Sequence, residues 1–445
     1  MVRPNAAGID VGSREHYVAV PPHLEGETVR KFGCYTSELL RLAAWLRECG
    51  VDTVALESTG VYWIPLYELL EDQGFEVVLV DARQLRSVSG RKTDVLDCQW
   101  IQQLHSYGLL KPAFRPKREI TVLRGYWRQR RNLVELCAEQ IQHMQRALEQ
   151  MNVQLHKVVT DITGVTGLTI IRAIVSGERD PKALAKLRQD GCKLAEEEFV
   201  DALTGTYRSE HLFVLKQSLA TFDFVQQQVM ECDRQIEQAM TSLPTSARGE
   251  IRVPAPRRRS GYRRKNQPHF NIYEELVRIG GVDLTDIEGI QVSTAMTTMT
   301  ELGSDVSKFP NDKHFTSWLG LATNNRITGG KIRSRRTRHV RNRLADAFRL
   351  AAQSVGRSDT ALGAFYRRKA AQIGAPKAIT ATARKIAQRV YWLLKYGRQY
   401  VHQGEEQYKQ QQQERELRVL VRRAAKRGLA LVAIDTGEIM TNTPA

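Results

Sequence analysis

The sequence predicts a chain with two kinds of structure, a mixed α/β part at its amino end and a mainly α-helical part after it. Over roughly the first hundred residues, short apolar runs alternate with helical patterns, which is typical of a sheet covered by helices on both faces. From Ile120 onward, apolar residues recur in steps of three and four, a spacing typical of long packed helices. A length of 445 residues exceeds one ordinary core, so we expect two to four domains.

The chain is strongly basic. It has 66 Lys and Arg residues against 49 Asp and Glu, a formal net charge of +17 and a sequence pI near 9.7. Such a charge suits a polyanionic partner, foremost nucleic acid. The sequence shows no apolar run of membrane-spanning length and no signal peptide, so we expect no membrane partner and a cytoplasmic location.

The α/β part is predicted to occupy residues 1–116. Three strands in a meander come first, and helices then alternate with strands, which indicates a mixed sheet. The predicted strands are Ala6–Ser13, His16–Val20, Glu27–Gly33, Asp52–Thr59 and Phe75–Asp81. The predicted helices are Ser37–Cys49, Tyr62–Asp72 and a third that starts near Thr93.

A long coiled-coil insertion is predicted over residues 117–250. One heptad pattern runs from Ile120 to Leu155, broken only by Arg130, and a second covers Phe222–Leu243. At about 1.5 Å per residue, a helix from Lys117 to Leu155 would be roughly 58 Å long. The two patterns allow either an antiparallel hairpin or pairing with another subunit.

A short phrase recurs within and after this insertion. The segment DITGVTGLTIIRAIVSG begins at Asp161, and DIEGIQVSTAMTTMTELG begins at Asp286. A tight Gly turn before a helix can hold a phosphate through backbone amides, and an ordinary helix cap has the same signature. Both interpretations stay open.

Three further segments complete the predicted organisation. Residues 251–272 are predicted as a basic linker, since Arg252–Lys265 holds seven cations and almost no apolar residue. Residues 273–402 are predicted as a C-terminal helical domain. Residues 403–445 are predicted as a charged helix and a poorly ordered tail.

Four acids occupy positions where polar residues are unusual. Asp10 interrupts the first predicted strand, Glu57 ends the fourth, and Asp94 and Asp97 lie one helical turn apart. Both helical acids share a stripe with apolar residues, so we expect them to point inward. Buried carboxylates cost several kcal/mol unless they are paired or bind a metal.

Two ways of neutralising these acids are open. Arg91 and Lys92 precede Asp94 and offer ion pairs. Four carboxylates from three elements, however, fit a hard cation such as Mg²⁺ better, because such ions take oxygen ligands. We favour the metal, which would stabilise charge during displacement at phosphorus.

The order of these motifs carries a resemblance to a known family. GIDVGS, LEST and TDVLD, on strand, strand and helix, resemble the ribonuclease-H-like fold in the Asp-Glu-Asp-Asp (DEDD) version of RuvC resolvases. With a long helical insertion and a C-terminal helical domain, the chain is similar to the DEDD insertion-sequence transposases. This family includes the Piv invertase and the bridge-RNA-guided recombinases and is called the "one-ten" family, with an "eleven-eleven" group that this chain resembles most.

The resemblance covers residues 5–115 and 275–400, and ESTGVYW and KTDVLDCQW are its most specific parts. It implies that Asp10, Glu57, Asp94 and Asp97 are catalytic and bind Mg²⁺. It also implies DNA as donor and target, a guide or bridge RNA as a further partner, and a homo-oligomer, either dimer or tetramer.

The second half of the resemblance is GLATNNRITGGKIRSRRTRHVRNRLADAFRLAA, which begins at Gly320. In the family, a small hydroxyl residue before two glycines attacks DNA and holds a covalent phosphoester. By position this residue is Thr328, where the family more often has Ser. Ser334 is the alternative nucleophile, and a plain Ser/Thr helix cap is the structural alternative.

Cations follow the predicted nucleophile closely. We expect a cationic helix whose apolar stripe includes Leu344 and Phe348 and whose other faces meet phosphates. The residues predicted to bind nucleic acid are Lys331, Arg333, Arg335, Arg336 and Arg338.

The leading hypothesis is thus an RNA-guided DNA recombinase that uses four carboxylates, a divalent metal and a hydroxyl nucleophile. The runner-up is a RuvC-like nuclease that cuts branched DNA with metal and water. A sugar-kinase or chaperone-type ATPase is a third reading, because GIDVGS and the phrase AIDTGE at Ala433 resemble phosphate loops. A non-catalytic RNA-binding scaffold is the fourth.

Overall fold

The computed structural model describes residues 1–58, 60–82, 85, 93–192, 194–246, 266–334, 336–397, 417–432 and 439–440. It divides into a first unit, Met1–Arg115, and a second unit, Pro116–Ala445, each described below by itself. Several sequence features lie outside the described residues: Arg91, Lys92, Arg335, residues 251–265 of the predicted linker, 403–416 and the AIDTGE phrase at Ala433. In the described part of the chain, no helix is both long and apolar enough to cross a membrane.

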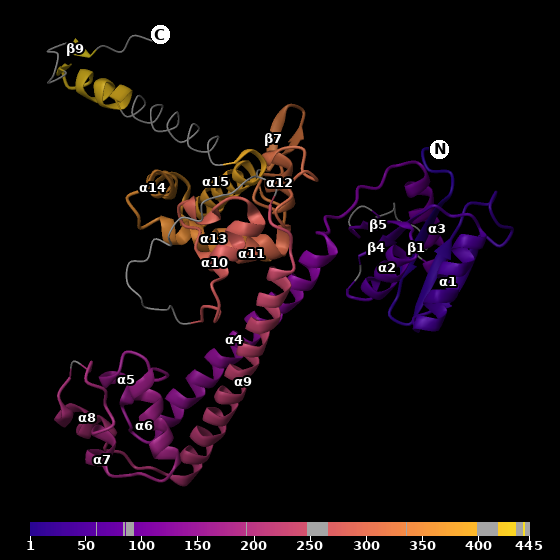
Figure 1. Ribbon diagram of the computed structural model, residues 1–445. Coiled ribbons are helices and arrows are strands. Elements are labelled where there is room, and N and C mark those ends of the chain that lie inside the picture. Colours follow the sequence, from indigo (N-terminus) through magenta and orange to yellow (C-terminus); the bar gives the residue numbers. More distant parts are fainter. Residues whose placement is uncertain are drawn as a thin grey trace. The chain divides into compact units, whose positions relative to one another are not determined.

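The first unit is a five-stranded mixed sheet in the order β3-β2-β1-β4-β5 (Figure 1). Strands β1 and β2, and β2 and β3, pair antiparallel, whereas β1, β4 and β5 run parallel. The strands are β1 (Ala6–Val11), β2 (Glu15–Ala19), β3 (Val29–Gly33), β4 (Thr53–Glu57) and β5 (Glu76–Val80). The helices are α1 (Thr36–Glu48), α2 (Trp63–Asp72) and α3 (Asp94–Ser106). The predicted meander followed by alternating helices and strands is confirmed.

The two faces of this sheet are covered differently. Ile9 and Leu56 are fully buried in a core that also holds Leu42 of α1 and Leu66 of α2. Side chains alternate along a strand, so Gly8 of β1 faces the opposite side. There a Cβ atom on Gly8 would lie 2.2 Å from the backbone nitrogen of Gln102. Helix α3 therefore packs directly on β1, and only glycine permits the approach.

The second unit begins with two long helices, α4 (Arg118–Gln150) and α9 (Ser209–Thr241), which pack together along their length (Figure 1). They run antiparallel, because Arg130 pairs with Asp233 while Cys137, further along α4, meets Gln226, earlier in α9. The hairpin within one chain is thus the pairing observed. Helix α4 ends before the predicted Leu155, since Asn152 adopts a left-handed φ of 55°.

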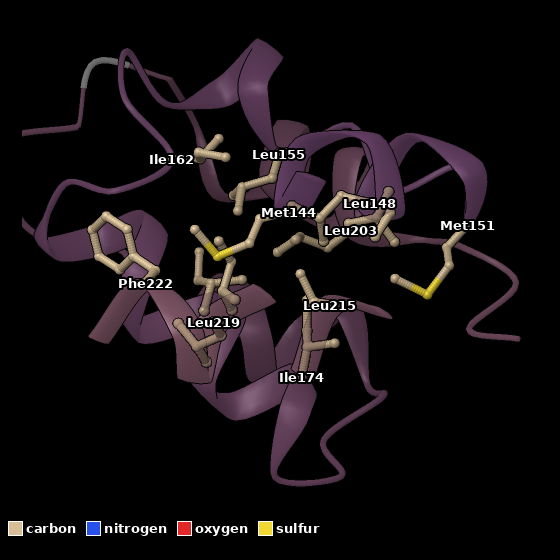
Figure 2. Packing of buried hydrophobic residues seen from close by; sticks show 14 of the residues in the cluster. Met144, Leu148, Met151, Leu155, Ile162, Ile174, Leu203, Leu215, Leu219 and Phe222 are labelled. Carbon is tan, nitrogen blue, oxygen red and sulfur yellow. The ribbon is translucent and has the colours of Figure 1, made fainter. Parts of the chain in front are cut away.

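A small helical domain closes the far end of this hairpin. It contains α5 (Leu155–Val158), α6 (Val165–Val175), α7 (Pro181–Ala185) and α8 (Glu196–Leu203). Met144 and Leu148 of α4 and Leu215 of α9 share its buried core with Leu155 and Leu203 (Figure 2). Leu155 is therefore buried in the core of the small helical domain and is not part of α4.

The rest of the second unit is mainly helical. Its elements are α10 (Ile272–Gly280), η1 (Leu284–Asp286), α11 (Val292–Leu302), α12 (Asp312–Trp318), β6 (Arg326–Thr328), β7 (Lys331–Ser334), α13 (Arg343–Val355), α14 (Ala361–Ile373), α15 (Ala375–Tyr396), β8 (Leu431–Val432) and β9 (Ile439–Met440). Arg128 of α4 forms a two-pronged ion pair with Glu301 of α11, at 2.9 and 2.7 Å. Arg278 of α10 donates to the carbonyls of Met240 and Leu243 at the end of α9. These contacts join α10 and α11 to the end of the α4–α9 hairpin that lies away from the small helical domain.

The buried ion pair between Arg130 and Asp233 should dominate the stability of this hairpin. Both side chains are at most 5% exposed, and Asp233 also accepts from the backbone of His269 at 3.1 Å. Asp233→Ala leaves an uncompensated buried cation, so we expect a loss of about 3–5 kcal/mol in the free energy of unfolding. Urea unfolding measures it, and Glu135→Ala, which breaks the exposed pair with Arg131, should cost under about 1 kcal/mol. Equal effects of the two variants would contradict the prediction.

His105 should make the first unit sensitive to acid. It is 2% exposed, its Nε2 shares a hydrogen bond of 2.9 Å with the Thr53 hydroxyl, and burial, aided by the Arg3 cation, lowers its pKa from 6.5 to about 4. As the pH falls, His105 is thus protonated near pH 6.5 in the unfolded chain but only near pH 4 in the folded chain. Its contribution, up to about 3 kcal/mol, is complete above pH 6.5 and is lost as the pH falls toward 4.

Urea unfolding between pH 7.5 and 4.5 measures this dependence. His105→Gln should flatten the pH profile of the unfolding free energy. The exposed residue His23 provides the control, since His23→Gln should leave the profile unchanged. An unaltered slope in His105→Gln would rule out this role.

Candidate active site

Two acids lie side by side at the carboxyl ends of neighbouring strands. Ile9 of β1 is in register with Leu56 of the parallel strand β4, so Asp10 and Glu57 come next on both strands. They share the face of Gly8, which is the face covered by α3. Both side chains are half-buried.

Helix α3 carries the other two acids toward the same end of the sheet. The Gln102 side chain donates to the carbonyl of Ala6 at the start of β1, at 3.3 Å, and the Cys98 carbonyl lies over Gly8. The helix thus runs opposite to β1, and its first turn lies toward the end of β1 that holds Asp10. Thr93 caps this turn by accepting from the backbone of Leu96, and the helix dipole there favours negative charge.

The buried thiol of Cys98 reports how two of these acids converge. Cys98 is fully buried, and burial raises its pKa to about 12, with the carboxylates of Asp10 and Asp97 adding to the shift. Each carboxylate must lie near the thiol to act on it. Asp10 of the sheet and Asp97 of the helix therefore both lie near the Cys98 thiol.

The expectation that both helical acids point inward is only partly met. Asp97 is half-buried, whereas Asp94 is exposed to solvent. The residues of α3 that are buried against the sheet are Cys98, Ile101, Gln102, His105 and Ser106. Asp94 lies a full turn before Cys98, at the open end of the helix, and for this reason its carboxylate escapes burial.

The donor chemistry of the four acids fits a hard divalent cation, which takes oxygen ligands. Within the ranges that the structure describes, however, no group of three or more His, Cys, Asp and Glu side chains is close enough to hold a metal ion. Asp10, Glu57 and Asp97 each have an interaction of their own. The fold thus gathers the acids at one edge, and binding a cation requires their side chains to draw closer together.

The predicted nucleophile lies at the tip of a β-hairpin in the second unit. Thr328 ends β6 and is in register with Lys331, which begins β7. Gly329 and Gly330 form the two-residue turn with φ values of +54° and +72°, the signature of a type I′ turn. Thr328 is exposed, so its hydroxyl is open to a ligand.

Ser334, the alternative nucleophile, is less exposed to solvent than Thr328. Ser334 is half-buried, and its Oγ accepts from the backbone nitrogen of Arg336 at 3.3 Å. On the other face of the hairpin, Ile327 and Ile332 form a cross-strand pair, 61% and 43% exposed. The face that holds Thr328 therefore also holds Lys331.

The prediction that these cations lie on a helix is wrong for most of them. Lys331 and Arg333 lie in β7, and Arg336 and Arg338 lie in an extended segment, because the Gly-Gly turn returns the chain along β6. The backbone of Asn324 donates to the carbonyl of Arg336, which prolongs this pairing. Helix α13 begins only at Arg343, and Leu344 and Phe348 are buried as expected.

These cations differ in their surroundings. Lys331, Arg333 and Arg336 are exposed and suited to phosphate contacts. Arg338 donates to the carbonyl of Ser317 at 3.1 Å and to its hydroxyl, so it also holds the segment against α12. Arg335 lies outside the described residues.

The recurring Asp-Ile-x-Gly phrase has two different environments. At the second copy, a Cβ atom on Gly289 would lie 2.3 Å from Val355, and Glu288 pairs with Arg389 at 3.5 Å. This turn packs against α13 and α15. At the first copy, Asp161 accepts from the backbone of Thr163 at 2.9 Å, and Val165 is 72% exposed. The glycine of the second copy thus permits close packing of this turn, a role that neither interpretation includes.

Two transposase family models match the chain. A transposase model, DEDD_Tnp_IS110, matches residues 7–153. A second model, described as Transposase IS116/IS110/IS902 family, matches residues 283–367. The chain belongs to the IS110 family of DEDD transposases. It is therefore a DNA transposase, and a DEDD domain implies binding of a divalent metal ion.

The two matches cover just over half of this transposase. The first contains all four acids, and the second contains the hairpin with Thr328. No curated protein matched the chain individually.

The conformation of the β6–β7 hairpin should depend on Gly329 and Gly330. Gly330→Val places a β-branched residue at a φ of +72°, which disfavours the turn by about 1–3 kcal/mol. We expect DNA strand transfer to fall at least about tenfold while global unfolding by urea is unchanged, because the hairpin is a surface element.

Gly125→Ala is the matched control, since a Cβ atom there meets nothing within 4 Å and α4 gains a better helix former. It should retain full strand transfer. Full activity of Gly330→Val would show that the turn conformation does not matter.

Proposed function

We propose that this transposase is an RNA-guided recombinase of an insertion sequence, which cleaves and rejoins DNA through a covalent link to Thr328. The observation that carries the proposal is the presence of two chemically complementary sites, an acidic edge on the mixed sheet of the first unit and an exposed hydroxyl in a cationic β-hairpin. Their residues fall within the two family matches. The proposed domains keep the boundaries 1–116, 117–250, 251–272, 273–402 and 403–445.

The charges of the two units support this division of labour. Residues 1–115 contain 12 Lys and Arg against 15 Asp and Glu, whereas residues 116–445 contain 54 against 34. An acidic unit suits a cation, and a basic unit suits the phosphate backbone. We therefore assign DNA binding chiefly to the second unit, with Lys331, Arg333, Arg335, Arg336 and Arg338 near the reacting phosphate.

The four carboxylates of the first unit would hold Mg²⁺. Asp10 and Glu57 are adjacent on the sheet, Asp97 approaches from α3, and Asp94 is free of burial and so has room to turn toward the others. When bound, the ion would neutralise charge on the scissile phosphate. The carboxylates would also orient that phosphate by holding the ion at the strand ends.

The hydroxyl of Thr328 would attack the phosphorus. A bond forms between Oγ and phosphorus while the bond to the 3′ oxygen breaks; the hydroxyl proton passes to solvent, and the released 3′ oxygen takes up a proton. A 3′-hydroxyl of another strand then reverses the step and restores the threonine. Threonine reaches the phosphorus from fewer rotamers than serine, since it is β-branched, so the reaction is slower but retained.

Partner choice would rest with RNA. We propose that a guide RNA pairs with donor and target DNA, while the protein contacts backbones without reading bases. The paired helices α4 and α9 would form a coiled coil, and the protein would act as a dimer or tetramer. The cytoplasm is the proposed location.

Three substitutions test the chemistry on a plasmid that carries the insertion sequence. Asp10→Asn should abolish the protein–DNA adduct, because a carboxylate ligand is lost, and should leave DNA affinity within about threefold. Thr328→Ala should also abolish the adduct, and Thr328→Ser should match or exceed the wild-type rate. Denaturing electrophoresis of labelled DNA detects the adduct, and gel shift measures affinity.

The water-dependent nuclease makes the opposite prediction. It would yield free 5′-phosphates with no attached protein, and Thr328→Ala would still cut. That result would replace the recombinase by the nuclease. An adduct that survives in Thr328→Ala and disappears in Ser334→Ala would move the role to Ser334.

A further inference from the structure

A row of side chains crosses the sheet of the first unit at the level of the acids. Lys31 of β3 is in register with Tyr17 of β2, and Tyr17 is in register with Asp10 of β1. Glu57 of β4 follows next to Asp10, as described above. The row thus places a phenol directly beside the acid pair, and it is visible only once the strands are paired.

Tyr17 and Asp10 share one face of the sheet. The neighbours of Tyr17 along β2, His16 and Val18, are buried, and Val18 belongs to the core with α1 and α2. Because side chains alternate, Tyr17 points to the opposite face, that of α3. Residues directly opposite each other on antiparallel strands have Cβ atoms about 5 Å apart, so the ring begins within reach of anything that the Asp10 carboxylate holds.

The surroundings of Tyr17 leave its ring partly open. Helix α3 packs chiefly on β1 and less on β2, and Tyr17 is half-buried. Among the described residues its phenol oxygen makes no hydrogen bond with another side chain, although the phenol lies near Lys31, whose pKa is raised chiefly by Glu15 and to a lesser degree by Tyr17. Beyond it, Lys31 pairs with Glu15 at 3.1 Å, and both are about half exposed. The fold therefore presents an aromatic surface that internal packing does not fully use.

We propose that Tyr17 is a substrate-positioning residue that stacks against a nucleotide beside the scissile phosphate; this inference rests on the proposed function. The first unit is net acidic, so apart from a bound cation it offers little electrostatic attraction to a DNA strand, and an uncharged contact would add to the hold on the DNA. Stacking on an aromatic ring supplies such a contact and tolerates any base. That tolerance suits a recombinase whose sequence choice is delegated to pairing.

Three variants test the proposal on the plasmid that carries the insertion sequence. Tyr17→Ala should lower adduct formation at limiting DNA by about 10- to 100-fold, the usual effect of losing one stacking contact. Tyr17→Phe should stay within about twofold of wild type, because the ring is kept. Tyr107→Ala is the matched control and should be unaffected, since Tyr107 is 58% exposed at the opposite end of α3.

A double-mutant cycle separates stacking from a structural role. An abasic nucleotide beside the scissile phosphate should remove most of the difference between wild type and Tyr17→Ala. The thermal unfolding midpoint should be the same in all variants. Wild-type activity of Tyr17→Ala, equal impairment of Tyr17→Phe, a defect that persists on abasic DNA, or a parallel fall in the unfolding midpoint would each overturn the proposal.

Failure of this inference is distinguishable from failure of the proposed function. If Asp10→Asn and Thr328→Ala abolish the adduct while Tyr17→Ala does not lower it, the recombinase stands and the stacking role falls. If Asp10→Asn forms the adduct normally, the proposed function itself fails.

Discussion

The direct packing of α3 on β1 is the constraint that places the acids of the first unit. Gly8 lets the helix backbone approach so closely that a single added carbon would clash at 2.2 Å. This contact sets both the position and the direction of α3, and its first turn therefore lies at the strand end that holds Asp10. Without the contact, Asp94 and Asp97 would have no fixed relation to the sheet. Gly8, which has no side chain, thus determines where the charged side chains of α3 lie.

Glycine has a second, different role in the hairpin of Thr328. There the two glycines accept left-handed backbone angles, and the resulting tight turn brings Lys331 opposite Thr328. The cost of placing several like charges together is tolerable because the segment is extended and exposed, so its side chains are well hydrated and spread along its length. A helix would have stacked the same cations at closer spacing. The extended segment suits contact with successive phosphates.

Buried polar groups give the helical part its specificity. The break in the heptad pattern at Arg130 coincides with the ion pair to Asp233, which only one alignment of α4 and α9 satisfies. A purely apolar seam would allow the two helices to slide by a turn, whereas a misaligned Arg130 would be left buried without a partner. Arg128 and Arg278 act in the same way, since each also has a specific acceptor: the Glu301 carboxylate for Arg128 and the Met240 carbonyl for Arg278.

The sequence by itself determined the order of strands and helices in the first unit and the presence of two long helices in the second, because these depend on local periodicity and on residue type. It did not determine that Asp94 is exposed, that the cations follow a β-hairpin, or that α4 ends at Gln150. Those outcomes depend on what lies across from each residue: the open end of the sheet, the strand that pairs through the Gly-Gly turn, and the core that takes up Leu155. Tyr17 shows the limit most clearly, since nothing near it in the chain sets it beside Asp10. Only the register of β1 and β2 does so, and register is a property of paired strands.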